Sequence, residues 1–164
     1  MLLAALSAFF VAAAAVEFEP TPLPVVDAML DLAAVRPDDV VFDLGCGDGR
    51  VVIAAAKRGA AGVCVDNDPR RIAESRARAA KAGVADRIEF RSEDLLATNL
   101  GRASVVMVFL SPEVNLELRP RLRALKPGTR VVSHWHAMGD WKPEKVVRIR
   151  GPWGRERTLF LWRL

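Results

Sequence analysis

The residues whose types and spacing could do chemistry begin with a glycine loop, VVFDLGCGDGR, at positions 40–50. Glycine-rich turns between a strand and a helix commonly hold the phosphates of a dinucleotide. Here the glycines recur as GxGxG rather than GxGxxG, and the carboxylates of Asp43 and Asp48 would repel a pyrophosphate. They would instead attract a cation, such as a sulfonium or the ammonium of an amino acid. The loop therefore predicts a cationic ligand.

Two further acids follow the glycine loop at the ends of later strands. Asp66 comes 21 residues after Gly45, where a carboxylate can bind both hydroxyls of a ribose. Asp94 is placed to contact an exocyclic amino group such as that of adenine. Ammonium, ribose and adenine together describe S-adenosylmethionine (SAM), which we expect as the cofactor. The cofactor-binding residues predicted from these stretches are Asp43, Gly45, Cys46, Gly47, Asp48, Asp66, Asn67 and Asp94.

The elements that must position these residues alternate between short apolar runs and helical repeats. Strands are predicted over residues 40–44, 62–66, 87–90, 103–110 and 129–135, with a closing hairpin of 146–150 and 157–164. Helices are predicted over residues 50–58, 69–82 and from 112 or 113 to about 125. Strands that alternate with helices imply a parallel sheet covered on both faces. We therefore predict a single α/β domain over residues 17–164, with a doubly wound, mostly parallel seven-stranded sheet and a C-terminal antiparallel hairpin.

Another helix is predicted in the stretch EPTPLPVVDAML, which contains three prolines. Thr21 can cap this helix with Pro22 at its first position, and Pro24 still falls in the first turn, where no backbone donor is required. The prolines are therefore interpreted as the start of a helix rather than as breakers.

The chain begins with a hydrophobic N-terminal segment, residues 1–16, which has no charged side chain and seven alanines. As a helix it would span about 24 Å, slightly less than a hydrocarbon core of about 30 Å. The small residues from Ala13 to Ala15 also suit a signal-peptide cleavage site. We expect a membrane anchor or signal peptide, with a membrane-associated, cytoplasmic domain because SAM is made in the cytosol. Export after cleavage is the alternative, which the acids just after the segment favour.

The two cysteines, Cys46 and Cys64, lie in apolar or glycine-rich stretches and do not form a CxxC pair. Two cysteines of this kind are typical of buried thiols, so we expect no disulfide. His134 and His136 lack a third ligand nearby beyond Asp140, and we expect no metal site.

Charge is distributed unevenly along the chain, whose net charge is +4. Residues 1–115 carry 12 basic and 16 acidic side chains, whereas residues 116–164 carry 12 and 4. The basic C-terminal third is either a solvated surface or a surface for nucleic acid, anionic lipid or an acidic partner.

Residues 20–164 resemble the class I SAM-dependent methyltransferases, and more narrowly the small protein-lysine methyltransferases. These are the archaeal broad-specificity enzymes and the mitochondrial enzymes that act on the c-type subunit of ATP synthase and on the adenine nucleotide translocase. The matching stretches are PTPLPVVDAMLDLAAV, DVVFDLGCGDGRVVIAAAKRGAAGVCVD, VMVFLSPEVNLELRPRL and LKPGTRVVSHWHAMGDW. The resemblance implies a Rossmann-like fold, SAM as cofactor with Thr21 and Pro22 packed nearby, and methyl transfer to the lysine side chain of a protein, membrane proteins included.

The chain departs from this family in two places. Relatives usually carry an acid and an aromatic where this chain has Trp135 and His136, which leaves the acceptor open. Many have glycine at the position of Cys64.

Transfer to lysine requires a neutral amine, and an amine of pKa near 10.4 costs roughly 4–5 kcal/mol to deprotonate at pH 7. A dry, aromatic-lined channel lowers that cost. We expect Phe109 to line such a channel, Glu113 to orient the amine or shape the exit, and His134 to accept a proton. The alternatives are a core phenylalanine, a first-turn acid favoured by the helix dipole, and a hydrogen-bonded structural histidine.

Other acceptors stay open as alternatives: a small molecule, or RNA or DNA bound by the basic C-terminal third. Methyltransferases that act on the amino group of adenine or glutamine carry an Asn/Asp-Pro-Pro-aromatic motif after the fourth strand, where this chain has FLSP. No cysteine follows that strand, so the nucleophile for methylation of cytosine C5 is also missing. Aromatics interleaved with the basic residues are lacking, so we do not expect nucleic acid. A third alternative is a protein that binds SAM without using it. The sequence does not indicate an oligomeric state.

Overall fold

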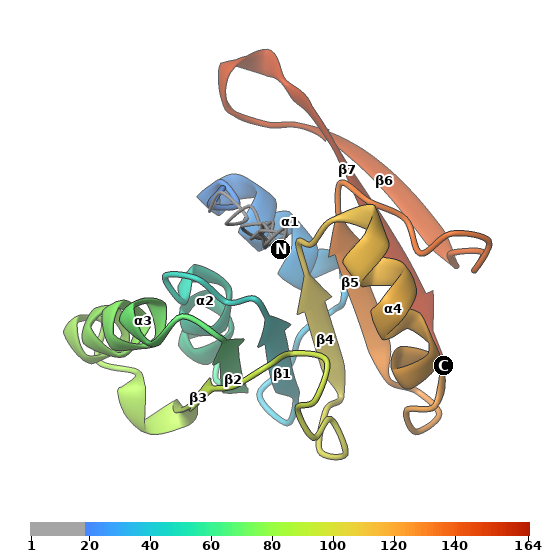
Figure 1. Ribbon diagram of the computed structural model, residues 1–164. Helices are drawn as coiled ribbons and strands as arrows, with labels where there is room; N and C mark the ends of the chain where they lie inside the picture. Colours follow the sequence, from blue (N-terminus) through green and yellow to red (C-terminus); the bar gives the residue numbers. More distant parts are fainter. Residues whose placement is uncertain (1–18) are drawn as a thin grey trace, which may run out of the picture.

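The computed structural model describes residues 19–164 and arranges them around one seven-stranded sheet (Figure 1). The strand order is β3-β2-β1-β4-β5-β7-β6. The strands are β1 (Val40–Leu44), β2 (Ala61–Asp66), β3 (Ile88–Ser92), β4 (Val105–Val108), β5 (Arg130–His134), β6 (Lys145–Arg150) and β7 (Glu156–Arg163). Strands β1 to β5 are parallel, and β7 runs antiparallel to both β5 and β6. This confirms the predicted α/β class, the mostly parallel sheet and the closing hairpin.

The helices cover both faces of the sheet. They are α1 (Leu23–Leu32), α2 (Arg50–Lys57), α3 (Pro69–Lys81) and α4 (Pro112–Arg123), with short 3₁₀ turns at Ala85–Arg87 and Pro152–Gly154. The apolar residues of α1, α2 and α3 pack on one face, and those of α4 pack on the other. The central strands are therefore buried on both sides, which explains why they are nearly continuous apolar runs rather than alternating ones.

The strand order places the predicted ligand site. Strand β1 pairs with β2 on one side and with β4 on the other, so the winding direction reverses between β1 and β4. Ligands of doubly wound sheets bind beyond the carboxyl ends of the strands at such a reversal. The glycine loop leaves the carboxyl end of β1 and leads into α2, as predicted.

Helix α1 begins at Leu23, one residue later than the sequence predicted. Its N-cap position is Pro22, which offers no side-chain cap, and Pro24 lies in the first turn. Thr21 is therefore not the cap. Its hydroxyl oxygen lies 3.3 Å from Nδ1 of His134, at the end of β5, because the chain before α1 passes the carboxyl edge of the sheet.

The amino edge of the sheet, opposite the predicted site, is held by a buried ion pair. Asp39 lies just before β1 and pairs with Arg130, the first residue of β5. Arg130 also donates to the Ala33 carbonyl at 2.7 Å, and Asp39 accepts from the Ser104 hydroxyl at 2.8 Å. These contacts tie α1, β1 and β5 together.

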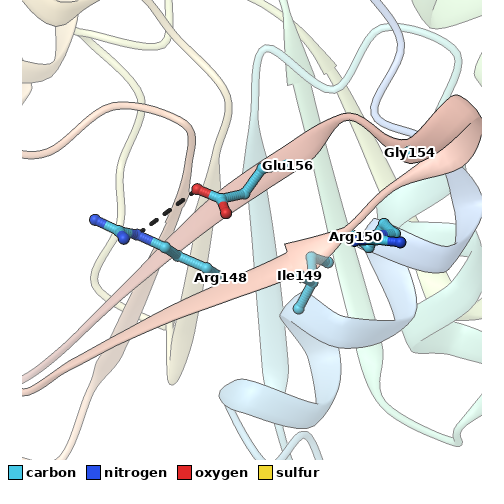
Figure 2. Close-up of a pocket in the computed structure, with 5 residues that line it drawn as sticks. All are labelled: Arg148, Ile149, Arg150, Gly154 and Glu156. Carbon is cyan, nitrogen blue, oxygen red and sulfur yellow. Dashed lines mark ion pairs between the residues drawn. The ribbon is translucent and has the colours of Figure 1, made fainter.

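Strands β6 and β7 form a hairpin that extends beyond the rest of the sheet (Figure 1). A pocket on it is lined by Arg148, Ile149, Arg150, Gly154 and Glu156 (Figure 2). Figure 2 shows Ile149 pointing toward α1, while Arg148 and Glu156 point away and approach each other at 3.8 Å. None of the predicted site residues lines this pocket.

The membrane-associated location expected from the sequence is corrected by the structure. Among residues 19–164, no helix has the length and apolar character needed to cross a membrane. The hydrophobic N-terminal segment, residues 1–16, lies outside the described residues.

Candidate functional site

The glycine loop turns sharply at three left-handed positions. Gly45, Gly47 and Gly49 have φ values of 81°, 54° and 78°, which side chains with a Cβ rarely adopt. The amides of Gly45 and Cys46 donate to the Val65 carbonyl at 2.8 and 3.0 Å, so the loop folds back over the end of β2. A Cβ on Gly49 would lie 2.7 Å from Cβ of Ser75, and the glycine therefore also allows α3 to approach.

Asp43 has a buried carboxyl group that lacks a partner among the described residues. Its residue is 6% exposed, and within residues 19–164 it forms neither an ion pair nor a side-chain hydrogen bond. Burial, and then the charges of Asp66 and Asp48, raise the pKa of Asp43 to about 8. A cation bound beside Asp43 would relieve the repulsion among these three acids. This agrees with the cationic ligand that the sequence predicts at the glycine loop.

Asp48 is buried as well, but it is already neutralised. Its carboxylate accepts from Arg50 Nη2 at 2.6 Å and lies 3.1 Å from Arg78 Nη1. Burial alone would raise its pKa, but the hydrogen bonds and charge of Arg50, with the charge of Arg78, hold the pKa of Asp48 below its ordinary value. Its direct contact with a cofactor stays a prediction, because in the structure it fixes the start of α2.

Asp66 ends β2 and organises the loop beside it. One carboxylate oxygen accepts from the Gly47 amide and the other from the Asp68 amide, both at 2.9 Å. These bonds hold the carboxylate rigidly at the strand end, where the sequence predicts a ribose.

Asn67 and Asp94 are exposed at the same edge of the sheet. Asn67 directly follows Asp66, and Asp94 follows β3 and accepts from the Leu96 amide at 2.9 Å. The structure therefore brings the predicted cofactor residues together at the ends of three adjacent strands.

The structure corrects the expectation of two free thiols. Cys46 and Cys64 form a disulfide, with Cα atoms 5.3 Å apart. Cys64 pairs in register with Asp43, and the loop after β1 returns over β2, so Cys46 arrives directly at Cys64. The bridge fastens the glycine loop to the second strand.

Phe109 and His134 form the second part of the site, at the ends of β4 and β5. Their ring centroids are 4.1 Å apart, and His134 is fully buried. Burial, and then the charges of Arg157 and His136, lower the pKa of His134 to about 4. Its Nδ1 faces the Thr21 hydroxyl, while Nε2 has no hydrogen-bond partner within residues 19–164. His134 is therefore neutral at physiological pH, and residues 19–164 leave one of its ring nitrogens free.

Glu113 lies in the exposed first turn of α4, which Ser111 caps through the Val114 amide. Its own backbone amide, and then the Ser111 hydroxyl, lower the pKa of its carboxyl group. These contacts match the first-turn alternative, so its role at a channel exit stays a prediction that Glu113→Gln turnover would test.

Sequence reasoning missed a cluster beside His134. Strand β5 ends at His134, and Trp135 adopts a left-handed φ of 73°, so the expected strand alternation stops there. The guanidinium carbon of Arg157, in β7, lies 4.9 Å from the centroid of the Trp135 ring. The sequence did hold an indication of this cluster. Arg157 is two residues before Leu159 and four before Leu161, so on a strand it lies on the same buried face of the hairpin as these two leucines.

The residues at the strand ends fit SAM. The unpaired carboxylate of Asp43 suits the cationic amino acid portion, the left-handed glycines allow close approach of the backbone, and Asp66 is fixed for a ribose. The cofactor would lie over the ends of β1 and β2, with the acceptor approaching beside Phe109 and His134.

Comparisons with known proteins agree with this site. The chain is 42% identical over 152 residues to a protein-lysine N-methyltransferase of Saccharolobus islandicus, covering 90% of this chain and 92% of that protein. It is 32% identical over 146 residues to the human lysine N-methyltransferase named for the C-type subunit of ATP synthase, covering 87% of this chain and 62% of that protein.

A solved structure and a family profile complete the comparison. The crystal structure of an RNA methyltransferase from Salinibacter ruber, in complex with S-adenosyl-L-homocysteine, is 48% identical and superposes with a TM-score of 0.83. The match covers 88% of this chain and 93% of that one. The ANTKMT methyltransferase domain matches residues 43–145. The chain therefore belongs to the ANTKMT methyltransferase family, and it is a SAM-dependent methyltransferase.

Proposed function

We propose that this enzyme transfers methyl groups to the lysine side-chain amine of a protein. The observation that carries the proposal is the buried imidazole of His134 at the strand ends beside the cofactor residues. It packs on Phe109, and its Nε2 has no partner in the part of the chain that the structure describes. Such a group can hold a neutral amine in a dry site. The names of the relatives from Saccharolobus islandicus and human, both lysine N-methyltransferases, support this acceptor.

The cofactor residues bind and orient the methyl donor. When bound, SAM supplies an electrophilic methyl group on a sulfonium, whose departure requires no acid. Asp43 would hold the cationic amino acid portion, Asp66 the ribose hydroxyls and Asp94 the adenine amino group. Gly45 and Gly47 let the backbone approach, and Thr21 and Pro22 close the site from the segment before α1.

The acceptor residues favour a neutral amine and orient it. Phe109 and the buried surroundings disfavour an ammonium, and the nearby charge of Arg157 opposes a second cation. When the His134 proton is on Nδ1, toward Thr21, Nε2 accepts a hydrogen bond from an N–H of the amine. The lone pair of the amine nitrogen is then free to attack the methyl group. Because its pKa is about 4, His134 acts by accepting this hydrogen bond rather than by storing a proton at pH 7.

RNA is the second candidate acceptor. The Salinibacter ruber protein, 48% identical to this chain, is described as an RNA methyltransferase. The C-terminal third, with 12 basic and 4 acidic side chains, offers charge that could meet phosphates.

One labelling experiment separates these acceptors. The full chain is incubated with SAM carrying a labelled methyl group and a cell lysate with its membranes, and portions are then treated with protease or nuclease. Loss of label to protease, with recovery of methyl-lysine, is expected. Loss to nuclease would instead establish the RNA candidate. Label in neither fraction would favour a small-molecule acceptor or a SAM-binding protein without transfer. Asp43→Ala, which removes the carboxylate for the cofactor, is the control that should not label anything.

A further inference from the structure

Arg157 is a buried cation with too few partners. The residue is 8% exposed, and its Nε has no hydrogen-bond partner within residues 19–164. Both terminal nitrogens lie 3.5 Å from the same oxygen of Glu19, whose side chain is 62% exposed. A guanidinium has five N–H donors, and a buried one is normally well satisfied by hydrogen bonds. The contacts that residues 19–164 make with this guanidinium leave most of that capacity unused.

The side chain is nevertheless held in a fixed position. Its guanidinium lies over the ring of Trp135, and a Cβ on Gly151 would come within 3.1 Å of Cγ of Arg157. The Trp135 amide also donates to the Thr158 carbonyl at 2.8 Å, which joins the end of β5 to β7 beside Arg157. A planar, braced guanidinium is suited to forked recognition of a carboxylate, because little side-chain entropy is lost on binding.

Trp135 adds backbone strain to this corner. A bulky residue at a φ of 73° is a strained conformation, and such strain concentrates at functional sites. Trp135 is also 44% exposed, so the ring that supports Arg157 on one side meets solvent on another.

The corner adjoins the acceptor site. The rings of His134 and Trp135 have centroids 6.3 Å apart, and the guanidinium carbon of Arg157 lies 4.9 Å from the centroid of the Trp135 ring. An extended peptide advances about 3.3 Å per residue, so a side chain within three positions of a residue held at His134 can reach Arg157.

We propose that Arg157, braced by Trp135 and Gly151, is a substrate subsite that binds the carboxylate of an aspartate or glutamate within three residues of the target lysine. This inference rests on the proposed lysine acceptor. Glu19 pairs weakly with the guanidinium when no substrate is present, and the substrate carboxylate displaces it. The charge of Arg157 thus selects an acidic neighbour, and it adds to the burial that keeps His134 neutral.

The test maps methylated lysines in lysate proteins, using the full chain and SAM with a deuterated methyl group, by mass spectrometry. For the wild type we expect more acidic residues within three positions of methylated lysines than around unmethylated ones. Arg157→Gln should lose this enrichment. For peptide pairs taken from the mapped sites, changing the acidic residue to its amide should lower kcat/KM about ten-fold or more in the wild type, the size of one charge-assisted hydrogen bond. Arg157→Gln should not distinguish the two peptides.

Two control variants separate this role from a structural one. Glu19→Gln removes the resident carboxylate, so it should keep or strengthen the acidic preference, whereas a purely structural Arg157–Glu19 pair predicts that both variants behave alike. Arg148→Gln removes an exposed arginine of the same hairpin and should keep the preference. Unchanged SAM affinity by calorimetry establishes that Arg157→Gln is folded.

Different failures have different meanings. Methyl-lysine without acidic enrichment in the wild type, or enrichment that persists in Arg157→Gln, overturns the subsite and leaves the lysine acceptor standing. Label in RNA and no methyl-lysine overturns both, since the substrate anion would then be a phosphate.

Discussion

The imidazole of His134 and the ring of Phe109 lie in contact at the ends of two paired strands, with centroids 4.1 Å apart. His134 is thereby enclosed, and its pKa falls from 6.5 to about 4. The unfolded chain binds a proton near pH 6.5 and the folded protein does not. The stability that the neutral imidazole contributes is thus complete above pH 6.5 and is lost as the pH falls toward 4.

The first prediction follows from that shift. Between pH 6.5 and pH 4 this single group should remove about 3 kcal/mol from the free energy of unfolding. Replacement by the uncharged amide in His134→Gln should lower stability at pH 7 and flatten the pH dependence in this window. Urea unfolding of both proteins at several pH values measures the difference. Parallel pH profiles would contradict the buried, neutral state of His134.

The second prediction concerns Asp43 and the cofactor. With a pKa of about 8, the carboxyl group is mostly protonated at pH 7. If the carboxylate pairs with the cationic portion of SAM, binding at pH 7 should release about one proton, and affinity should rise as the pH increases from 6 toward 8. Calorimetry in two buffers of different ionisation enthalpy counts the proton. Binding at pH 7 without proton release would mean that Asp43 does not meet the cation, and Asp43→Asn should bind SAM more weakly.

Local patterns in the sequence were sufficient to locate the strands of the sheet. Strand β1 matches its predicted bounds, and Asp68 caps α3 with Pro69 in the first turn, as predicted. The other strands differ from their predicted bounds by at most two residues at either end. Burial on both faces explains this success, because continuous apolar runs bounded by Gly, Pro or Asp can be recognised without knowing their partners.

The site was predicted less completely because part of it depends on contacts between distant segments. Thr21 meets His134 across 113 positions, whereas a local rule assigned it to a helix cap. Arg157 lies against Trp135 because β7 pairs with β5, and no spacing along the chain indicates that pairing.

The third prediction tests the Cys46–Cys64 disulfide, which sequence reasoning did not expect. The two residues are 18 positions apart, and a cross-link over a loop of this size contributes about 3 kcal/mol. A reductant should therefore lower the free energy of unfolding by about that amount in urea. It should have no effect on Cys64→Ala. If alkylation of the unreduced, denatured protein labels both cysteines, the sequence-based expectation of two thiols was right.

The fourth prediction concerns the buried pair of Asp39 and Arg130 at the amino edge of the sheet. Although burial raises the pKa of Asp39, hydrogen bonds from the Arg36 amide, Ser104 and Arg130, with the charge of Arg130, lower it overall. Its stabilising contribution is therefore present above the ordinary pKa near 4 and is lost as the pH falls through the lowered value.

Asp39→Asn should cost about 3–5 kcal/mol, because it leaves the Arg130 guanidinium buried without its counter-charge. Asp39→Asn combined with Arg130→Met should recover much of that loss, since the uncompensated charge is then gone. Urea unfolding of the three proteins at pH 7 measures both steps. The pair lies at the opposite edge from the glycine loop, so SAM affinity of the folded variants should stay within about two-fold of the wild type, a ratio worth about 0.4 kcal/mol. A double variant no more stable than Asp39→Asn would show that the carboxylate acts mainly through Ser104 and the Arg36 amide rather than through Arg130.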